Sequence, residues 1–126
     1  MGKNIIDTDQ APKAIGPYSQ AVVSGNLVFT SGQLPIDPAV GKIIQGTIED
    51  RTHMVLKNLK AIAEKAGANL DNAVKTTVYL TDMQDFQAVN LVYAEYFKEP
   101  YPARSAFQVA ALPLGSNIEI EAVFQL

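Results

Sequence analysis

The sequence predicts one α+β domain, built as a single sheet of about five or six strands with two helices packed on one of its faces. Its 126 residues are 48% hydrophobic and 18% charged, which is typical of one globular domain. Some segments alternate apolar and polar residues, as strands do, and two longer segments carry apolar residues at helical spacing. Their order, β-β-α-β-α-β-β, favours one layer of sheet covered by both helices.

The first third of the chain predicts a leader, a hairpin and a long loop. Residues 1–18 are polar and interrupted by proline and glycine, so we expect extended and turn conformations there. Residues 21–30 contain two short β-favouring runs around Gly25 and Asn26, a pair suited to a tight hairpin turn. Turn-forming residues then continue as far as Gly46.

The first helix is expected to begin after Thr47, a residue type that caps helix N-termini, and to stop at Gly67. Its buried face is predicted from spacings of three and four residues: Ile48, Val55, Leu56, Leu59, Ile62, Ala63 and Ala66. A strand follows, in which Val74, Thr76, Val78 and Leu80 alternate with Lys75, Thr77 and Tyr79.

The second helix is expected to be capped by Asp82 or Asp85 and to end before Pro100. One face carries Phe86, Val89, Asn90, Tyr93 and Phe97. Two final strands are predicted from about Arg104 to Ala110 and from Ile118 to Phe124. Helices on one side leave the other face of the sheet uncovered, so we expect a homo-oligomer that hides it and places ligand clefts between subunits.

Composition narrows the function classes. With 13 acidic residues against 10 basic ones and a pI near 5.0, a surface that follows nucleic-acid phosphates is not expected. The chain has no cysteine, which suits a reducing cytoplasm and removes disulfides and thiol nucleophiles. The N-terminal segment lacks an apolar stretch, so no signal peptide or membrane anchor is predicted.

His53 is the only histidine, and its helical phase predicts a solvated side chain on the polar side of the first helix. A serine–histidine–aspartate triad and a histidine metal site therefore lack a component, and the phosphate-binding glycine motifs are missing. Neither a metal nor a cofactor is expected. The chemistry has to come from arginine, tyrosine, carboxylate, amide and backbone groups.

Four residues are candidates for such chemistry, each with a structural alternative. Arg104 follows a loop that prolines make rigid. Its side chain either binds a ligand carboxylate, forms a structural salt bridge, or is solvated at the edge of the sheet. Glu119 shares a strand face with Glu121, where it orients water or is simply exposed. Asn90 needs a partner if buried, which is a ligand or the backbone, and Tyr18 binds a ligand or caps a loop.

The segments that contain these residues resemble the RidA family, also called the YjgF/YER057c/UK114 family, along nearly the whole chain. They are Ala11–Gln20 (APKAIGPYSQ), Thr30–Pro35 (TSGQLP), Val74–Val78 (VKTTV), Pro102–Ser105 (PARS) and Ile118–Ala122 (IEIEA). The resemblance implies a chorismate-mutase-like fold, a homotrimer with clefts between subunits, and 2-iminobutanoate/2-iminopropanoate deaminase activity without a cofactor.

Roles are carried over from the family position by position. Arg104 would bind the substrate carboxylate and Glu119 would position the attacking water. Tyr18 would line the pocket as a third catalytic residue. The other substrate-binding residues would line or border the same cleft: Asn90, Ser31, Gly32 and Ala106. Many members have cysteine at the position of Ala106, so a contribution from that thiol is lost and only the backbone N–H remains. The turn at Leu114 also replaces a more charged one.

Two other functions stay open at this point. The same arginine suits a non-catalytic module that binds 2-keto acids or other small carboxylates. Some family members are linked to endoribonuclease activity or inhibition of translation, although the acidic pI weighs against RNA binding. We expect imino-acid hydrolysis in preference to both, because the arginine and glutamate positions are intact.

Overall fold

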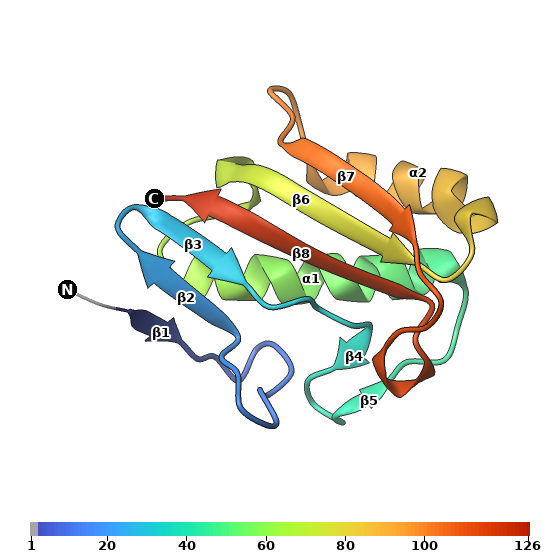
Figure 1. The fold of residues 1–126 in the computed structure, drawn as a ribbon, viewed down its shortest axis with the longest axis horizontal. Coiled ribbons are helices and arrows are strands. Elements are labelled where there is room, and N and C mark those ends of the chain that lie inside the picture. The colour runs from blue at the N-terminus through green and yellow to red at the C-terminus, as the bar shows by residue number, and fades with distance from the viewer. Residues whose placement is uncertain (1–2) are drawn as a thin grey trace.

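The computed structural model describes residues 3–126 and contains a six-stranded sheet in the order β1-β2-β3-β8-β6-β7, with β4 and β5 forming a separate pair (Figure 1). The strands are β1 Asn4–Ile6, β2 Ala21–Ser24, β3 Leu27–Thr30, β4 Ile36–Asp37, β5 Lys42–Ile43, β6 Ala73–Leu80, β7 Ala103–Gln108 and β8 Ile118–Gln125. The helices are α1 Ile48–Lys65 and α2 Phe86–Tyr96. Neighbouring strands are antiparallel except β6 and β7, which run parallel because α2 crosses over between them.

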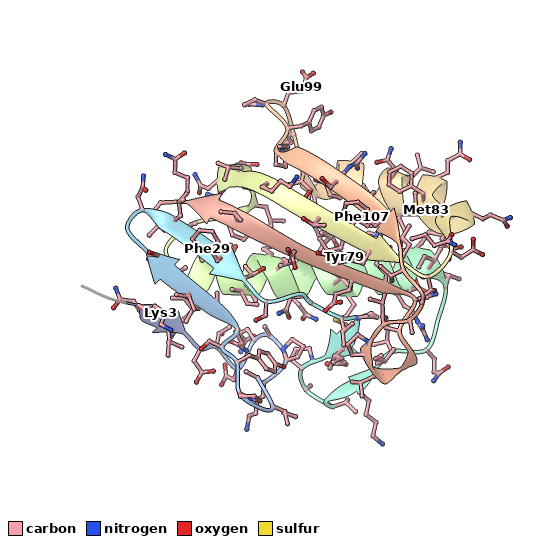
Figure 2. The ribbon with its side chains drawn as sticks, viewed as in Figure 1. Lys3, Phe29, Tyr79, Met83, Glu99 and Phe107 are labelled. Carbon is pink, nitrogen blue, oxygen red and sulfur yellow. The ribbon has the colours of Figure 1, made fainter. Side chains whose placement is uncertain are left out.

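Both helices lie behind the sheet in Figure 1, so the predicted α+β fold is confirmed. The core consists of inward residues of the sheet and of α1: Val28, Val78, Leu80, Ile118, Ile120 and Phe124 with Val55, Leu56, Leu59 and Ile62. The opposite face has no helix over it, and Figure 2 shows Phe29, Tyr79 and Phe107 there. Phe29 and Phe107 are 45% and 52% exposed, a large apolar exposure for one sheet face.

The N-terminal residues are more ordered than the leader interpretation expects. Asn4–Ile6 pair with β2 as an edge strand, which the sequence does not reveal because three residues are too few to show alternation. The following loop is tied to the sheet by the buried side chain of Gln20. Its amide accepts a 2.7 Å hydrogen bond from the Thr8 N–H and donates to the carbonyls of Thr8 and Pro12.

The hairpin and α1 form where predicted. Gly25 has the positive φ of 61° that a two-residue hairpin turn requires. Thr47 caps α1 by accepting from the Asp50 N–H, and the Asp50 carboxylate accepts from the Thr47 N–H in return. Gly67, with φ of 92°, follows the end of the helix.

Two predictions about side-chain placement are wrong. Val74 is 40% exposed, because the register shifts between Ala73 and Lys75 and Ala73 takes the inward position instead. His53 is half-buried rather than solvated, and its Nδ1 lies 2.8 Å from the Tyr96 hydroxyl, so it connects α1 to α2. Periodicity within one helix cannot show which neighbouring helix will cover its flank.

The second helix begins at Phe86, directly after Asp85, one of the two predicted cap residues. Asp82 accepts from the Gln84 N–H and so caps a short 3₁₀ turn, Met83–Asp85, which leads into α2. Asp85 makes no side-chain cap bond. Across residues 3–126, neither helix combines the length and the apolar character needed to cross a membrane.

Candidate functional site

Arg104 is held on the outer strand β7 by an amide and two aromatic rings. Its register partner on β6 is the buried Thr76, so the side chain lies on the helix-covered side at the edge of the sheet. Arg104 Nη1 donates a 2.7 Å hydrogen bond to Asn90 Oδ1. Its Cζ lies 4.8 Å from the ring centre of Tyr93 and 5.2 Å from that of Phe86.

We call Arg104, Asn90, Tyr93 and Phe86 the arginine cluster. Arg104 is exposed, and within residues 3–126 its guanidinium donates only to the Asn90 amide, so its other N–H groups can meet an anion. The interpretation of Asn90 as a buried side chain bonded to the backbone is therefore wrong. The Asn90 side chain is exposed, and it accepts a hydrogen bond from Arg104. An arginine fixed in this way loses little freedom when a carboxylate binds.

Sequence reasoning missed the part played by both aromatic members of this cluster, Phe86 and Tyr93. Their spacing predicts an apolar stripe on the second helix, and the two rings also pack against the guanidinium. The Tyr93 hydroxyl lies 2.7 Å from Thr76 Oγ1. Burial raises the pKa of Tyr93, which outweighs the lowering by Thr76 and Arg104, so the ring stays neutral beneath the cation. A cavity of about 400 Å³ opens beside the cluster and is also lined by Tyr101 and Pro102.

Ala106 lies two residues beyond Arg104 on the same strand. β7 is an edge strand, and the Val109 N–H bonds inward to the Leu80 carbonyl at 2.8 Å. Because amide directions alternate along a strand, the N–H of Ala106 points to the free edge, on the side away from β6. A backbone donor therefore stands on the same edge as the arginine.

Glu119 lies on the other side of the sheet. It alternates on β8 with the buried Ile118 and Ile120, which puts Glu119 and Glu121 on the open face as predicted. Burial first, and then the charge of Glu121, raise the pKa of Glu119 above its ordinary value of 4.5. The carboxyl group therefore sits in partly desolvated surroundings, where it interacts strongly with a nearby water or ligand.

Gly32 packs directly against this carboxylate. Two backbone hydrogen bonds between Gln33 and Ile120, of 2.8 and 3.1 Å, fix the chain next to Glu119. A Cβ added at Gly32 would overlap the Glu119 side chain, lying 2.7 Å from its Cδ. Glycine therefore allows this close approach without displacing the Glu119 side chain, and it is not needed for an unusual φ.

Tyr18 and Ser31 complete this second group. The Ser31 hydroxyl donates a 2.6 Å hydrogen bond to the Ser19 carbonyl, which fastens the Tyr18 loop to the end of β3. Tyr18 is 52% exposed, and its hydroxyl accepts only a long 3.4 Å bond from the Ile15 N–H, so it is available to a ligand. With Gly32 and Glu119, these residues line a cavity of about 790 Å³, which we call the carboxylate cavity.

The two groups do not meet within one chain. β6 lies between β7 and β8, Arg104 faces the helices, and Glu119 faces the open side. The cavity beside the arginine cluster and the carboxylate cavity have no lining residue in common. The structure thus brings Tyr18, Ser31, Gly32 and Glu119 together and, separately, Arg104 with Asn90 and Ala106. Over residues 3–126, no cluster of three or more His, Cys, Asp or Glu side chains is suited to hold a metal ion.

The charge of Glu121 provides a direct test of this electrostatic picture. Replacing Glu121 by Gln is expected to lower the pKa of Glu119 towards its ordinary value, because the repulsion between the carboxylates disappears while burial remains. Because the pKa of Glu119 is raised in the folded protein, ionisation of Glu119 lowers the stability of the fold as pH rises above 4.5. The variant should therefore be more stable than wild type at neutral pH, and it should gain no stability from this effect below pH 4.5, where Glu119 is protonated. Carbon-13 NMR titration of Glu119, with unfolding measured at both pH values, checks both effects. An unchanged Glu119 titration would contradict the electrostatic coupling.

The chain is thus a small α+β protein with a single mixed sheet, two helices on one face, an arginine packed against two aromatic rings and a partly buried glutamate. The family described as Endoribonuclease L-PSP matches residues 8–125. The chain therefore belongs to the RidA/YjgF (L-PSP) family.

Named relatives span almost the whole chain. A RutC family protein of Pyrococcus horikoshii is 55% identical over 121 residues, covering 96% of each chain. The human 2-iminobutanoate/2-iminopropanoate deaminase is 50% identical over 121 residues, covering 96% of this chain and 88% of the human one. Members of the family thus carry several functional names.

Solved structures agree closely with the fold. A putative endoribonuclease of Thermotoga maritima has a TM-score of 0.97 at 56% identity, covering 99% of this chain and 98% of the other. Escherichia coli TdcF with bound serine has a TM-score of 0.93 at 43% identity, covering 98% and 99%.

Proposed function

We propose that this chain hydrolyses reactive 2-imino and enamine acids, such as 2-iminobutanoate and 2-iminopropanoate, to 2-keto acids and ammonia. The observation that carries the proposal is the separation of two complementary groups on one chain, a seated guanidinium and a partly buried carboxylate. Each group is half of a site for a small acid. A second copy of the chain supplies the missing half, so the active unit is an oligomer, for which we propose a homotrimer.

In the proposed cleft, Arg104 and the Ala106 N–H of one subunit hold the substrate carboxylate, and Asn90 keeps the guanidinium in place. Glu119 of the other subunit orients a water towards C2 of the imine, next to Tyr18, Ser31 and Gly32. The water oxygen adds to C2 of the protonated imine, the C=N electron pair moves to nitrogen, and Glu119 accepts a water proton, which gives a carbinolamine. Glu119 then returns this proton to the nitrogen, the C–N bond breaks with its electrons leaving on ammonia, and the hydroxyl proton passes back to Glu119 as C=O forms, which gives the 2-keto acid.

The comparisons support this reading in two ways. The human relative is named for the same reaction, and TdcF holds serine, whose carboxylate is attached to a nitrogen-bearing carbon as in an imino acid. Exposed Phe29 and Phe107 supply the apolar face that an oligomer would cover. We place this single domain in the cytoplasm, acting on free small molecules without a cofactor and without nucleic acid.

Subunit mixing tests both parts of the proposal. Imine is generated in situ by an amino-acid oxidase, and semicarbazide traps what survives. Arg104→Ala and Glu119→Gln should each lose nearly all activity, yet after unfolding and refolding together in equal amounts they should recover about a quarter of wild-type activity, since half of the copies supply each intact group. The same variants refolded separately are the control. Failure of the mixture to recover activity would rule out a site shared between subunits.

The alternatives give different results in the same assays. A well-folded wild type that binds 2-oxobutanoate without accelerating imine decay would instead be a small-carboxylate binding module. RNA cleavage is addressed with a labelled RNA at low and moderate salt, where phosphate binding would weaken steeply with salt. The only histidine of the chain is bonded to Tyr96, so a pair of histidines for RNA cleavage is not available.

A further inference from the structure

The carboxylate cavity extends well beyond the polar groups that the proposed reaction uses. At about 790 Å³ it is within the range of pockets that hold drug-sized ligands, and a three- or four-carbon acid fills a small part of it. Besides Glu119 and Tyr18, it is lined by residues of the N-terminal loop, of the β4–β5 hairpin and of the short turn before β8. Figure 1 shows the hairpin and that turn side by side at the lower end of the sheet.

Much of the remaining cavity wall is apolar, although Asp9 and Lys13 also line it. The apolar residues lie in the β4–β5 hairpin, in the segment just before it, and in the turn before β8: Leu34, Ile36, Pro38, Val40, Pro113 and Leu114. Leu114 is 73% exposed and Val40 is 65% exposed, so the rim presents two aliphatic side chains to whatever occupies the cavity. We call these six residues the apolar end.

The backbone at Leu114 strengthens this observation. Leu114 has a φ of 59°, and among residues 3–126 it is the only non-glycine residue with a left-handed conformation. Glycine and asparagine adopt this conformation with little strain, whereas for leucine it is sterically unfavourable and no local side-chain hydrogen bond compensates. A strained backbone that holds an exposed leucine over a cavity points to a contact with an apolar ligand group.

We propose that the apolar end receives the side chain of the substrate, so that the preferred substrates are 2-imino acids with branched or long aliphatic side chains. The inference rests on the proposed function and names the substrate class of that site. With the carboxylate held by the arginine of the adjoining subunit and C2 next to Glu119, the side chain at C2 extends into the remaining space of the cavity. Leu114 and Val40 are then specificity-determining residues, because they close over the outer part of an aliphatic chain.

The test compares the 2-imino acids formed from leucine and from alanine, using wild type and Leu114→Asn. Asparagine suits the left-handed backbone, so the variant should fold. The ratio of kcat/KM for the leucine-derived substrate to that for the alanine-derived substrate should exceed one in wild type and fall about tenfold in the variant. The control is Leu91→Gln, at a leucine on α2 that is 72% exposed and lies outside the cavity, where the ratio should not change.

Val40→Thr provides a second variant with the same expected direction. Calorimetric binding of the products, 4-methyl-2-oxopentanoate and 2-oxopropanoate, provides a readout that does not depend on turnover. Full activity on the alanine-derived substrate with an unchanged ratio in both variants would overturn this inference and leave the proposed function standing. A changed subunit assembly with an unchanged ratio would also overturn it, because the apolar end would then be a contact between copies. Absence of turnover for either substrate in wild type would overturn the proposed function itself.

Discussion

Replacing Arg104 by alanine is expected to lower kcat/KM for 2-iminobutanoate hydrolysis by about 10²- to 10³-fold, because the variant loses the charge-assisted bonds that hold the substrate carboxylate. The side chain is exposed and seated on the rings of Tyr93 and Phe86 rather than in the core, so the fold should survive. Release of 2-oxobutanoate, with semicarbazide trapping the surviving imine, measures the effect.

Arg104→Lys is the matched control. Lysine keeps the charge but cannot form two parallel bonds to a carboxylate, so its kcat/KM should lie between those of the alanine variant and wild type. Circular dichroism and sedimentation show whether each variant remains folded and assembled. Wild-type kcat/KM in a folded Arg104→Ala protein would remove the arginine from the proposed mechanism.

Replacing Gly32 by alanine is expected to lower kcat by about 10²-fold, because the added methyl group displaces the Glu119 carboxylate that aims the water. Gly32 does not have a positive φ, so alanine imposes no backbone strain there and stability should change little. The flexible glutamate is the group that has to move. Steady-state kinetics on 2-iminobutanoate should show the loss mainly in kcat rather than in KM.

A double-mutant cycle shows whether Gly32 acts through Glu119. In a Glu119→Gln background that retains measurable turnover, adding Gly32→Ala should cause almost no further loss, because the carboxylate that it displaces is already gone. Additive losses would indicate instead that the methyl group blocks substrate or disturbs the subunit contact. That result would make Gly32 a residue of the cavity wall and not a positioning residue for Glu119.

Much of the fold can be read from local sequence pattern. The Gly25–Asn26 hairpin, the Thr47 cap, the Gly67 stop and the alternation of Ile118 to Phe124 are short-range signals, and the structure confirms each of them. Alternation also predicts correctly that Glu119 and Glu121 share the open face. These features depend on residues that are close in the chain, where backbone geometry decides the outcome.

Features that depend on packing between distant segments are not predicted. Residues 4–6 become a strand only because they pair with the edge of β2, and Val74 turns outward because the strand register shifts there. His53 finds Tyr96 across 43 positions of sequence. In each case the partner is supplied by another element, and the periodicity of a single segment contains no information about it.

The candidate site divides in the same way. The sequence by itself determined which residue types are available to the site. They are an arginine after a rigid loop, a glutamate on an alternating strand and a glycine before Gln33. Only the tertiary structure decided that Tyr93 and Phe86 seat the arginine, that Gly32 touches Glu119, and that β6 separates the two groups. The reason is physical: residue type sets the chemistry of a side chain, whereas strand order and the face on which it lies set which groups it can reach.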